Sequence, residues 1–348
     1  MAEWQRFLLN WYDQNRRDLP WRNTRDPYAI WISEVILQQT RIAQGLDYYH
    51  KFLARFPTVT DLANGEESAV LKTWQGLGYY SRARNLHKAA KQVRDQYSGQ
   101  FPDTREALLS LAGVGPYTAS AVASIAFHQP HAVVDGNVIR VLSRFLHIQD
   151  DMALSTGRKK VEEAAEQVLV RDQPGDWNQA LMELGATVCT PTGPKCTDCP
   201  VSAFCRARAE GVQEQLPVKS PKRKPRDRYI HYLAMDSPQG FALQRRTGND
   251  IWRHLYEFPS WESKEPQRDP EVLFQNLSGW ISGEPVLIRQ SEVKHQLTHQ
   301  TIHATFLHVR VPKITATGDV VFITPDTPIR VPVHRLMEKY LAGMGFIL

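Results

Sequence analysis

The sequence contains four cysteines, and all of them lie within one short segment. They are separated by six, two and five residues: Cys189, Cys196, Cys199 and Cys205. In a reducing compartment such a group predicts a metal site rather than disulfide bonds. Four thiolates at this spacing can bind either one tetrahedral zinc ion or an iron–sulfur cluster, and the spacing alone slightly favours zinc because zinc ribbons are common. Four unrelated buried cysteines are the third alternative.

A carboxylate inside an apolar segment is a second candidate for chemistry. Helical spacing gives Glu34 apolar neighbours one turn away on each side, among them Trp31 and Leu37. Desolvation among such neighbours disfavours the charged form and raises the pKa, which suits a general acid that works near neutral pH. The alternative is a glutamate that faces solvent or forms a structural ion pair. Gln38 and Gln39 beside it favour a polar surface that faces a ligand.

A pair of glycines lies between two predicted helices, in the sequence LAGVGPYTAS at 111–120. Gly113 and Gly115 permit a sharp turn and a close approach of the backbone to a ligand. Pro116 would begin the next helix, whose first free amides can hold a phosphate. The segment predicts a helix-hairpin-helix motif at about 108–124 that binds the DNA backbone, and a simple turn is the alternative. A dinucleotide-binding loop is excluded, since a third glycine and a preceding strand are missing.

A further carboxylate, Asp135, follows Gly115 by twenty residues, in the sequence VDGNV at 134–138. On its own, an aspartate before a glycine predicts a helix cap or a turn. It becomes a candidate catalytic group only through a family resemblance.

The elements that must position these residues fall into regions with different patterns. Residues 1–205 have apolar residues at three- and four-residue spacing, which predicts an all-α region. Helix starts are predicted at Asp26, which precedes a proline, and at Asp103, which has Glu106 three residues later as in a capping box. A basic, proline-rich linker at 206–228 follows.

After the linker the pattern changes to short alternating runs, which predict strands. Examples lie at 229–235 and 305–311, and a final helix is predicted near 333–343. Residues 229–348 are therefore expected to form an α+β domain.

Composition excludes some classes of protein. The chain has 348 residues and a net charge of +5, and no apolar run approaches the ~20 residues that cross a bilayer. Polar residues interrupt the first apolar segment, so no secretory signal is predicted and we expect a protein that stays inside the cell. The modest positive charge is compatible with a polyanionic partner but does not require one.

Taken together, five segments resemble the MutY family of adenine DNA glycosylases, in the endonuclease III superfamily. They contain Glu34, the sequence GLGYYSRAR at 76–84, the glycine hairpin, Asp135 and the cysteine loop at 189–205. The resemblance covers the first two hundred residues almost continuously. It implies an all-α helix-hairpin-helix glycosylase domain at 1–205 and one [4Fe-4S] cluster held by the four cysteines. The implied substrate is double-stranded DNA that contains adenine opposite 8-oxoguanine or guanine.

The same resemblance assigns catalytic roles. Glu34 would protonate the adenine, and Asp135 would stay ionised and stabilise an oxocarbenium-like sugar, so that two carboxylates hold opposite protonation states. Tyr117 and Asn137 would support Asp135 and the attacking water. Contacts to DNA, the adenine or the lesion are expected from Arg22, Gln38, Gln39, Tyr79, Gly113, Gly115, Leu297, Thr298 and His299.

Two positions argue against strand cleavage. Endonuclease III proper has a lysine nucleophile where this chain has Tyr117, and Ile139 replaces a lysine that some family members carry. Without an amine no Schiff base forms, so we expect a monofunctional DNA N-glycosylase. The alternatives are an endonuclease III-like lyase for oxidised pyrimidines and a non-catalytic protein that binds lesions.

The C-terminal region also resembles this family. The segment 250–260 is similar to the GLWEFP segment of its Nudix-like domain, while the REuxEE helix of Nudix hydrolases is absent. We therefore expect residues 229–348 to recognise 8-oxoguanine without hydrolysing a second substrate. The sequence His295–His299 aligns with the family's His-x-Phe-Ser-His loop, with Leu297 and Thr298 in place of Phe and Ser.

Partners and location follow from the same resemblance. We expect a monomer that binds DNA, has no membrane partner and can meet replication or repair proteins. The basic linker segment at 221–226 is interpreted as a solvated stretch that touches phosphates rather than as a nuclear localisation signal. A bacterial, cytoplasmic and nucleoid-associated protein is expected.

Overall fold

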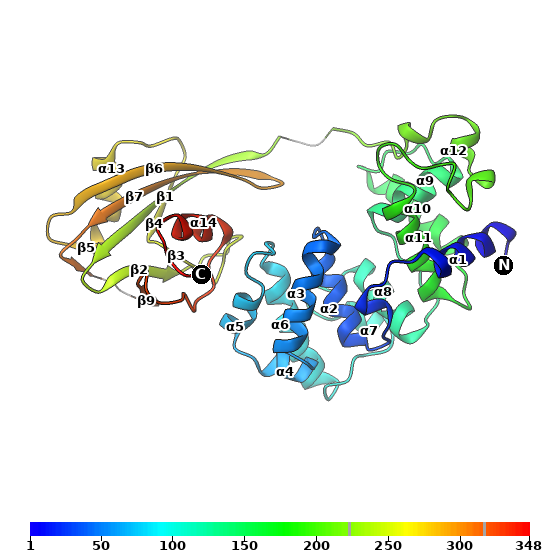
Figure 1. Cartoon of the computed structure of the whole chain (residues 1–348), viewed down its shortest axis with the longest axis horizontal. Helices are drawn as coiled ribbons and strands as arrows, with labels where there is room; N and C mark the ends of the chain where they lie inside the picture. Colours follow the sequence, from blue (N-terminus) through cyan, green and yellow to red (C-terminus); the bar gives the residue numbers. More distant parts are fainter. Residues whose placement is uncertain (222–223, 316–317) are drawn as a thin grey trace. The chain divides into compact units, whose positions relative to one another are not determined.

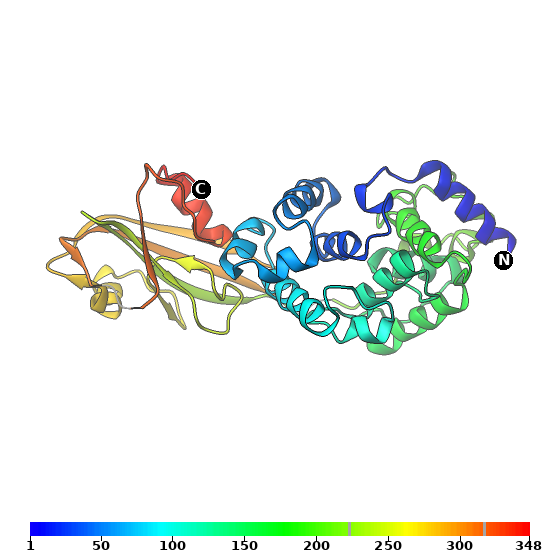
Figure 2. The same ribbon diagram turned by 90° about the horizontal axis from the view of Figure 1, so that it is seen from below.

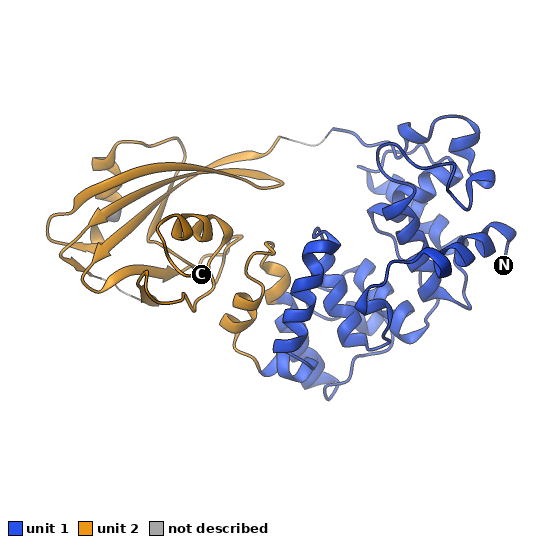
Figure 3. Cartoon of the chain, viewed as in Figure 1, with its two compact units in different colours: residues 1–64, 85–221 blue, residues 65–84, 222–348 orange. Residues whose placement is uncertain are grey.

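The structure is a computed structural model, and it describes residues 1–221, 224–315 and 318–348. Contacts divide the chain into two compact units (Figure 3). Unit 1 comprises residues 1–64 and 85–221, and unit 2 comprises residues 65–84 and 222–348. A helical segment from the first half of the chain, 65–84, thus belongs to the same unit as the C-terminal region, although the sequence places it within the domain 1–205.

Unit 1 consists of helices and their connections (Figures 1 and 2), as the sequence predicts for an all-α region. Its α-helices are α1 (Glu3–Asn15), α2 (Pro27–Leu37), α3 (Ile42–Arg55), α4 (Val59–Asn64), most of α6 (Ser81–Gln96), α7 (Arg105–Leu109), α8 (Pro116–Phe127), α9 (Gly136–Leu146), α10 (Ser155–Gln167), α11 (Pro174–Thr187) and α12 (Arg206–Ala209). Short 3-10 turns are η1 (Pro20–Arg22), η2 (Ser202–Phe204) and η3 (Gln213–Gln215). In the part of the chain that the structure describes, no helix is both long and apolar enough to cross a membrane.

One predicted helix start is confirmed and the other is wrong. Asp26 caps α2, where its side chain accepts hydrogen bonds from the first-turn amides of Tyr28 and Ala29. The cap of α7 is Thr104 rather than Asp103, because the threonine hydroxyl accepts from the amide of Ala107. Aspartate and threonine are both common helix caps. With Thr104 as the cap, α7 buries Leu108 in the core.

One hydrophobic core joins four helices of unit 1. It contains Leu8 of α1, Val141 of α9, Val161 of α10 and Trp177 of α11, all of them buried. Three of the four cysteines pack against this same core. The cysteine loop is therefore attached to the helices that carry one side of the site, α9 and α11.

Unit 2 contains a mixed sheet with the strand order β3-β2-β1-β7-β6, in which β4 also pairs with β1 and β9 with β2. The strands are β1 (Arg226–Ser237), β2 (Gly240–Arg245), β3 (Tyr256–Glu257), β4 (Ser260–Ser263), β6 (Val286–Gln296), β7 (Gln300–Arg310) and β9 (Val320–Ile323), and a small second sheet pairs β5 (Ile281–Ser282) with β8 (Lys313–Ile314). Its helical elements are α5 (Glu67–Thr73), the start of α6, α13 (Pro270–Leu277), η4 (Ser278–Trp280) and α14 (Arg335–Gly343). The predicted strands at 229–235 and 305–311 correspond to β1 and β7, and the final helix is α14.

Two helices cover opposite faces of this sheet, because neighbouring strand residues point in opposite directions. Leu233 of β1 packs in one cluster with Leu273 of α13. On the other face, Phe306 of β7 stacks on Tyr232 of β1 and on Tyr340 of α14. The expected α+β character of the C-terminal region is confirmed.

The predicted linker 206–228 is partly folded. It contains α12 and η3, it buries Ala207 and Leu216, and the carbonyl of Leu216 accepts a hydrogen bond from Arg144. At its other end, β1 begins at Arg226. Lys222 and Arg223 lie outside the described residues.

Candidate active site

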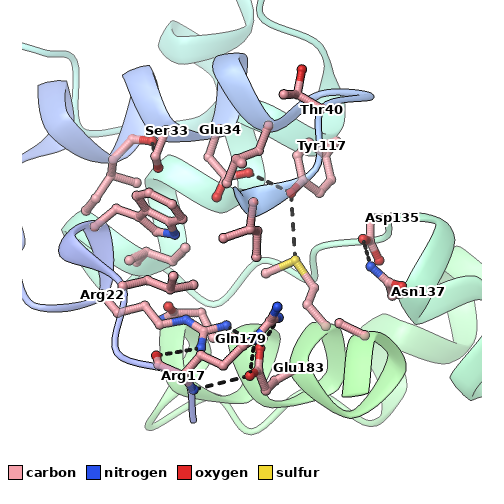
Figure 4. A pocket seen from close by; sticks show the side chains of 18 residues that line it. Arg17, Arg22, Ser33, Glu34, Thr40, Tyr117, Asp135, Asn137, Gln179 and Glu183 are labelled. Atoms are coloured by element: carbon pink, nitrogen blue, oxygen red, sulfur yellow. Dashed lines mark hydrogen bonds and ion pairs between the residues drawn. The ribbon is translucent and has the colours of Figure 1, made fainter. Parts of the chain in front are cut away.

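A cavity of about 210 Å³ in unit 1 brings all four predicted catalytic residues together (Figure 4). Its lining comes from α2 and α8 on one side and from α9 and α11 on the other. The volume lies below the ~300 Å³ at which sites for drug-sized ligands begin, so the cavity suits a small ligand. Its polar lining residues are Arg17, Arg22, Ser33, Glu34, Thr40, Tyr117, Asp135, Asn137, Gln179 and Glu183.

Glu34 lies in the middle of α2 and is only 8% exposed, as the apolar spacing predicts. Burial raises its pKa to about 7, although a hydrogen bond from Tyr117 acts in the opposite direction. That bond joins the tyrosine hydroxyl to Oε2 of Glu34 at 2.6 Å. The other carboxylate oxygen is left to hold a proton, which is the state a general acid needs.

Asp135 caps α9 and is held by two donors. The amide of Val138 and the side-chain amide of Asn137 each donate to one of its oxygens at 2.7 Å. Burial raises the pKa of Asp135, while these hydrogen bonds favour the charged form. The helix-cap interpretation and the catalytic one therefore apply to the same residue, since the cap fixes a carboxylate at the cavity.

Tyr117 has a different partner from the expected one. Its hydroxyl donates to Glu34 and also lies 3.7 Å from the sulfur of Met182. Tyr117 and Asn137 were both expected to support Asp135, and of these two only Asn137 forms a hydrogen bond with it. The reason is geometric, because α8 carries Tyr117 and packs directly on α2, which carries Glu34. Tyr117 thus orients the proposed acid.

The sequence analysis missed a buried ion cluster at the base of the cavity. Glu183 of α11 is fully buried and accepts hydrogen bonds at 2.7 Å from both Arg17 and Arg22. Burial opposes its ionisation, but the two guanidinium groups outweigh burial and lower the pKa of Glu183 to about 2. The signal that identifies Glu34 is weaker around Glu183, whose neighbours one turn away in α11 include the polar residues Gln179 and Thr187.

The helix-hairpin-helix prediction is confirmed by α7, the glycine turn and α8. Gly113 has φ +73°, and a Cβ there would lie 2.5 Å from the Cβ of Asn85, so this position requires glycine. Gly115 caps α8 in extended conformation, and a Cβ there would meet open space. Pro116 occupies the first turn of α8, as predicted.

The other residues expected to contact DNA or the lesion lie outside this cavity. Gln38 donates to the hydroxyl of Thr118 at 3.2 Å, and Gln39 is exposed with φ +60°. In unit 2, Leu297–His299 form the tip of the hairpin between β6 and β7. Tyr79, at φ +48° and 42% exposed, shares a 2.7 Å hydrogen bond with Thr298 at this tip.

All four cysteines line one small cavity beside α9, together with Arg144 and Arg208. They are free thiols, and burial raises the pKa of Cys199 to about 11. Arg144 is buried and its guanidinium lies 3.3 Å from the sulfur of Cys189. Among the described residues, no three potential ligands converge as closely as the ligands of a single metal ion do.

Arg140 of α9 links the cysteine loop to the carboxylate that is the second catalytic candidate, Asp135. Its guanidinium donates to the carbonyls of Cys189 and Gly185, each at 2.7 Å, and to the side-chain oxygen of Asn137 at 2.9 Å. Asn137 in turn donates to Asp135. The orientation of Asp135 therefore depends on the backbone at the start of the cysteine loop.

Comparisons with known proteins agree with this geometry. Two family models match: the HhH-GPD superfamily base excision DNA repair protein at residues 32–170, and the NUDIX domain at residues 231–343. An adenine DNA glycosylase from Homo sapiens is 38% identical over 95% of this chain and 72% of its own length. One from Buchnera aphidicola is 33% identical over 88% of this chain and 87% of its own length. This chain belongs to the adenine DNA glycosylase family.

As a member of that family it is a DNA N-glycosylase that excises adenine in base excision repair. Solved structures match its helical part. A thermostable thymine-DNA glycosylase has a TM-score of 0.54 at 33% identity, covering 59% of this chain and 95% of that chain. A non-covalent endonuclease III–DNA complex, at 24% identity and a TM-score of 0.51, covers 61% of this chain and 100% of that chain and shows the fold alone. The expected helix-hairpin-helix and Nudix-like folds are confirmed.

The raised pKa of Glu34 predicts how adenine release by this glycosylase depends on pH. A general acid must be protonated, so the single-turnover rate should fall about tenfold per pH unit above pH 7. Rates measured from pH 5.5 to 9 on a duplex that contains mispaired adenine check this. A rate that stays constant up to pH 9 would contradict the role of Glu34.

The same burial predicts a pH-dependent stability. Folded Glu34 binds its proton up to about pH 7, whereas its ordinary pKa is 4.5, so the folded state loses stability as pH rises between these values. The loss amounts to roughly 3 kcal/mol and should be absent in Glu34→Gln. Urea unfolding of both proteins at pH 5 and pH 8 measures it, and parallel pH dependences would show that Glu34 titrates normally.

Removal of Glu183 should destabilise the fold because it leaves the buried guanidinium group of Arg22 and the partly exposed one of Arg17 without their counter-ion. We expect Glu183→Ala to lower the free energy of unfolding by about 3–5 kcal/mol. Asp95→Ala is the matched control, since it breaks an equally short but exposed ion pair with Arg94 and should cost under about 1 kcal/mol. If both variants lose the same free energy of unfolding in urea, burial does not make the Glu183 ion pairs more stabilising than an exposed pair.

Proposed function

We propose that this glycosylase removes adenine paired with 8-oxoguanine or guanine by hydrolysis alone, without breaking the strand. The observation that carries the proposal is the cavity in which a buried Glu34, bonded to Tyr117, and Asp135, bonded to Asn137, line the same space. Two carboxylates in unlike environments are the arrangement that glycosidic bond cleavage needs.

The adenine must leave the duplex before it can reach these groups, because its glycosidic bond is inaccessible in the base stack. Gln179, which lines the cavity, carries one hydrogen-bond donor and one acceptor. A carboxamide of this kind pairs with the N6 and N7 atoms of adenine. Glu183 and its two arginines form a fixed, charged floor beside that position.

In the proposed reaction, Glu34 protonates a ring nitrogen of adenine, which makes the base a neutral leaving group. The Tyr117 hydroxyl donates to Oε2 of Glu34, so we place the transferable proton on Oε1. Asp135 remains ionised with help from its two amide donors and stabilises the positive charge that develops on the sugar. A water molecule then forms the new bond to the sugar carbon and gives its proton to the Glu34 carboxylate, which restores the acid.

Strand cleavage requires an amine, and the lining residues offer none. Tyr117 occupies the hairpin position, and no lysine is among the described residues that line the cavity. An arginine cannot replace it, because its guanidinium stays protonated and is a poor nucleophile. These observations favour hydrolysis over a Schiff base.

The cysteine loop fits an iron–sulfur cluster better than a single zinc ion. In a four-iron cluster each cysteine binds a different iron, so the sulfurs stand farther apart than four ligands of one ion. All four cysteines line one small cavity, as this arrangement requires. Arg144 beside Cys189 supplies positive charge for bound thiolates. A [4Fe-4S] cluster held there would stabilise the loop on which the Arg140 contacts depend.

Recognition of 8-oxoguanine is proposed for the hairpin tip Leu297–His299 together with Tyr79. The tip offers an apolar side chain, a hydroxyl and an imidazole next to an exposed aromatic ring. Leu297 lacks the stacking face of a phenylalanine, so Leu297→Phe should change the preference for 8-oxoguanine over guanine. Equal preferences of the two proteins in binding assays would reject this.

Single-turnover adenine release tests the whole proposal, with duplexes that contain adenine opposite 8-oxoguanine or guanine. We expect the wild type to release adenine, to prefer 8-oxoguanine, and to yield strand breaks only after alkali treatment. Glu34→Gln should lose at least about 100-fold in rate, the usual contribution of acid catalysis. Asp135→Asn should lose at least about 100-fold as well, because it removes the charge that stabilises the sugar cation. Strand breaks without alkali would support the lyase alternative, and a fully active Glu34→Gln would overturn the mechanism.

A further inference from the structure

Val333 in unit 2 is held by two side chains that flank Tyr79 in the sequence. The hydroxyl of Tyr80 donates to the carbonyl of Val333 at 3.2 Å, and the amide of Val333 donates to the side-chain oxygen of Gln75 at 3.3 Å. Val333 and Tyr80 are both buried. The backbone at Val333 is thus bonded on both sides by the segment 65–84, which Figure 3 colours with unit 2.

The next residue, His334, is fully buried and makes three directed contacts. Its Nδ1 accepts the amide of Met337 and so caps α14, which places the proton of the neutral ring on Nε2. Nε2 then donates to Glu257 at 3.0 Å. One face of the ring stacks on Trp252, with centroids 3.7 Å apart and planes 4° from parallel.

Glu257 keeps this imidazole from rotating. It is buried and accepts further hydrogen bonds from Tyr232 at 3.2 Å and from Ser260 at 2.7 Å, and it is paired with Arg246. A fully satisfied buried network of this kind rigidifies its surroundings.

Trp252 continues the contacts toward the hairpin tip. Its ring lies 6.1 Å from that of His295, near the end of β6 and two positions before Leu297. The tip itself contains Thr298, which shares its hydrogen bond with Tyr79. Tyr79 and the tip are therefore joined twice: directly at the surface, and through the buried path Tyr80–Val333–His334–Trp252–His295.

The surface bond alone is too weak to hold this arrangement. A solvent-exposed hydrogen bond contributes about 1 kcal/mol, while a left-handed backbone at a residue such as Tyr79 costs about 1–3 kcal/mol. The strain must be balanced by contacts that water does not reach. The Val333–His334 junction provides such contacts.

We propose that the Val333–His334 junction is a positioning element for lesion recognition, which holds Tyr79 and the hairpin tip Leu297–His299 in register with each other. Its residues act through Tyr80 and Trp252 and do not touch DNA or the reacting atoms. This inference rests on the proposed recognition of 8-oxoguanine by the tip and Tyr79.

Tyr80→Phe tests the junction by removal of one oxygen atom. We expect the ratio of single-turnover rates on 8-oxoguanine and guanine duplexes to fall about tenfold, since a lost hydrogen bond of about 1.4 kcal/mol corresponds to that factor. Tyr28→Phe is the matched control, because the Tyr28 hydroxyl is also buried and donates to a backbone carbonyl, that of Phe56, at 2.7 Å in unit 1. The control should lose similar stability and keep the ratio of the wild type.

A second measurement needs no DNA. His334→Asn keeps a side chain that can cap α14 but removes the ring that stacks on Trp252. Amide hydrogen exchange at 295–300 should become at least about tenfold faster in His334→Asn and in Tyr80→Phe, and should be unchanged in Tyr28→Phe.

The outcomes separate this inference from the proposed function. If the wild type prefers 8-oxoguanine and Tyr80→Phe keeps that preference, or if Tyr28→Phe lowers the ratio equally, the junction has no positioning role. A wild type without any preference would overturn the proposed recognition and with it the role of the junction in specificity. Unchanged exchange at 295–300 in both junction variants would overturn the buried path itself.

Discussion

The chemistry proposed for this glycosylase depends on the removal of water from one carboxylate. Glu34 can hold a proton near neutral pH because α2 buries it, and it is aimed because Tyr117 of α8 binds one of its oxygens. The remaining features of the cavity follow from that demand. Burial raises the pKa of both acids, but Asp135 has two amide donors that favour its charged form where Glu34 has one hydroxyl. The cavity also contains a third carboxylate, Glu183, which forms ion pairs with Arg17 and Arg22. These pairs keep Glu183 ionised, so it does not take part in the proton transfer proposed for Glu34.

The fold and most of the site could be predicted from the sequence, where local chemistry was sufficient. Burial of Glu34 followed from helical spacing, and the glycine turn followed from two glycines and a proline between apolar segments. The structure adds the reason for one of these glycines, since a Cβ at Gly113 would collide with Asn85. The partner of Tyr117 and the Glu183 cluster could not be predicted, because they depend on which helices pack together rather than on any one segment. The prediction that Asp103 caps α7 was wrong for a smaller reason. Asp103 and Thr104 are adjacent and both are residue types that cap helices, and in the structure Thr104 is the cap.

The cysteine loop and Asp135, the proposed catalytic aspartate, are connected by a chain of hydrogen bonds. Arg140 bonds the backbone at Cys189 and the side chain of Asn137, which in turn bonds Asp135. A change in the loop would therefore move a carboxylate that no cysteine touches. In this protein the loop acts on the chemistry by holding backbone positions, and any redox role of a cluster would be separate from that contribution.

The grouping of residues 65–84 with the C-terminal unit has a consequence for how the chain can be divided. The polypeptide enters unit 2 twice, first as α5 with the Tyr79 turn and again after residue 221. A fragment that ends at the linker would keep Tyr80 and Gln75 but lose the backbone of Val333 that they bind. Such a fragment would expose a buried tyrosine hydroxyl and the apolar side of its segment. The linker is therefore not the boundary of unit 2, and recombination at the linker would divide that unit unless the new C-terminal part supplied an equivalent junction.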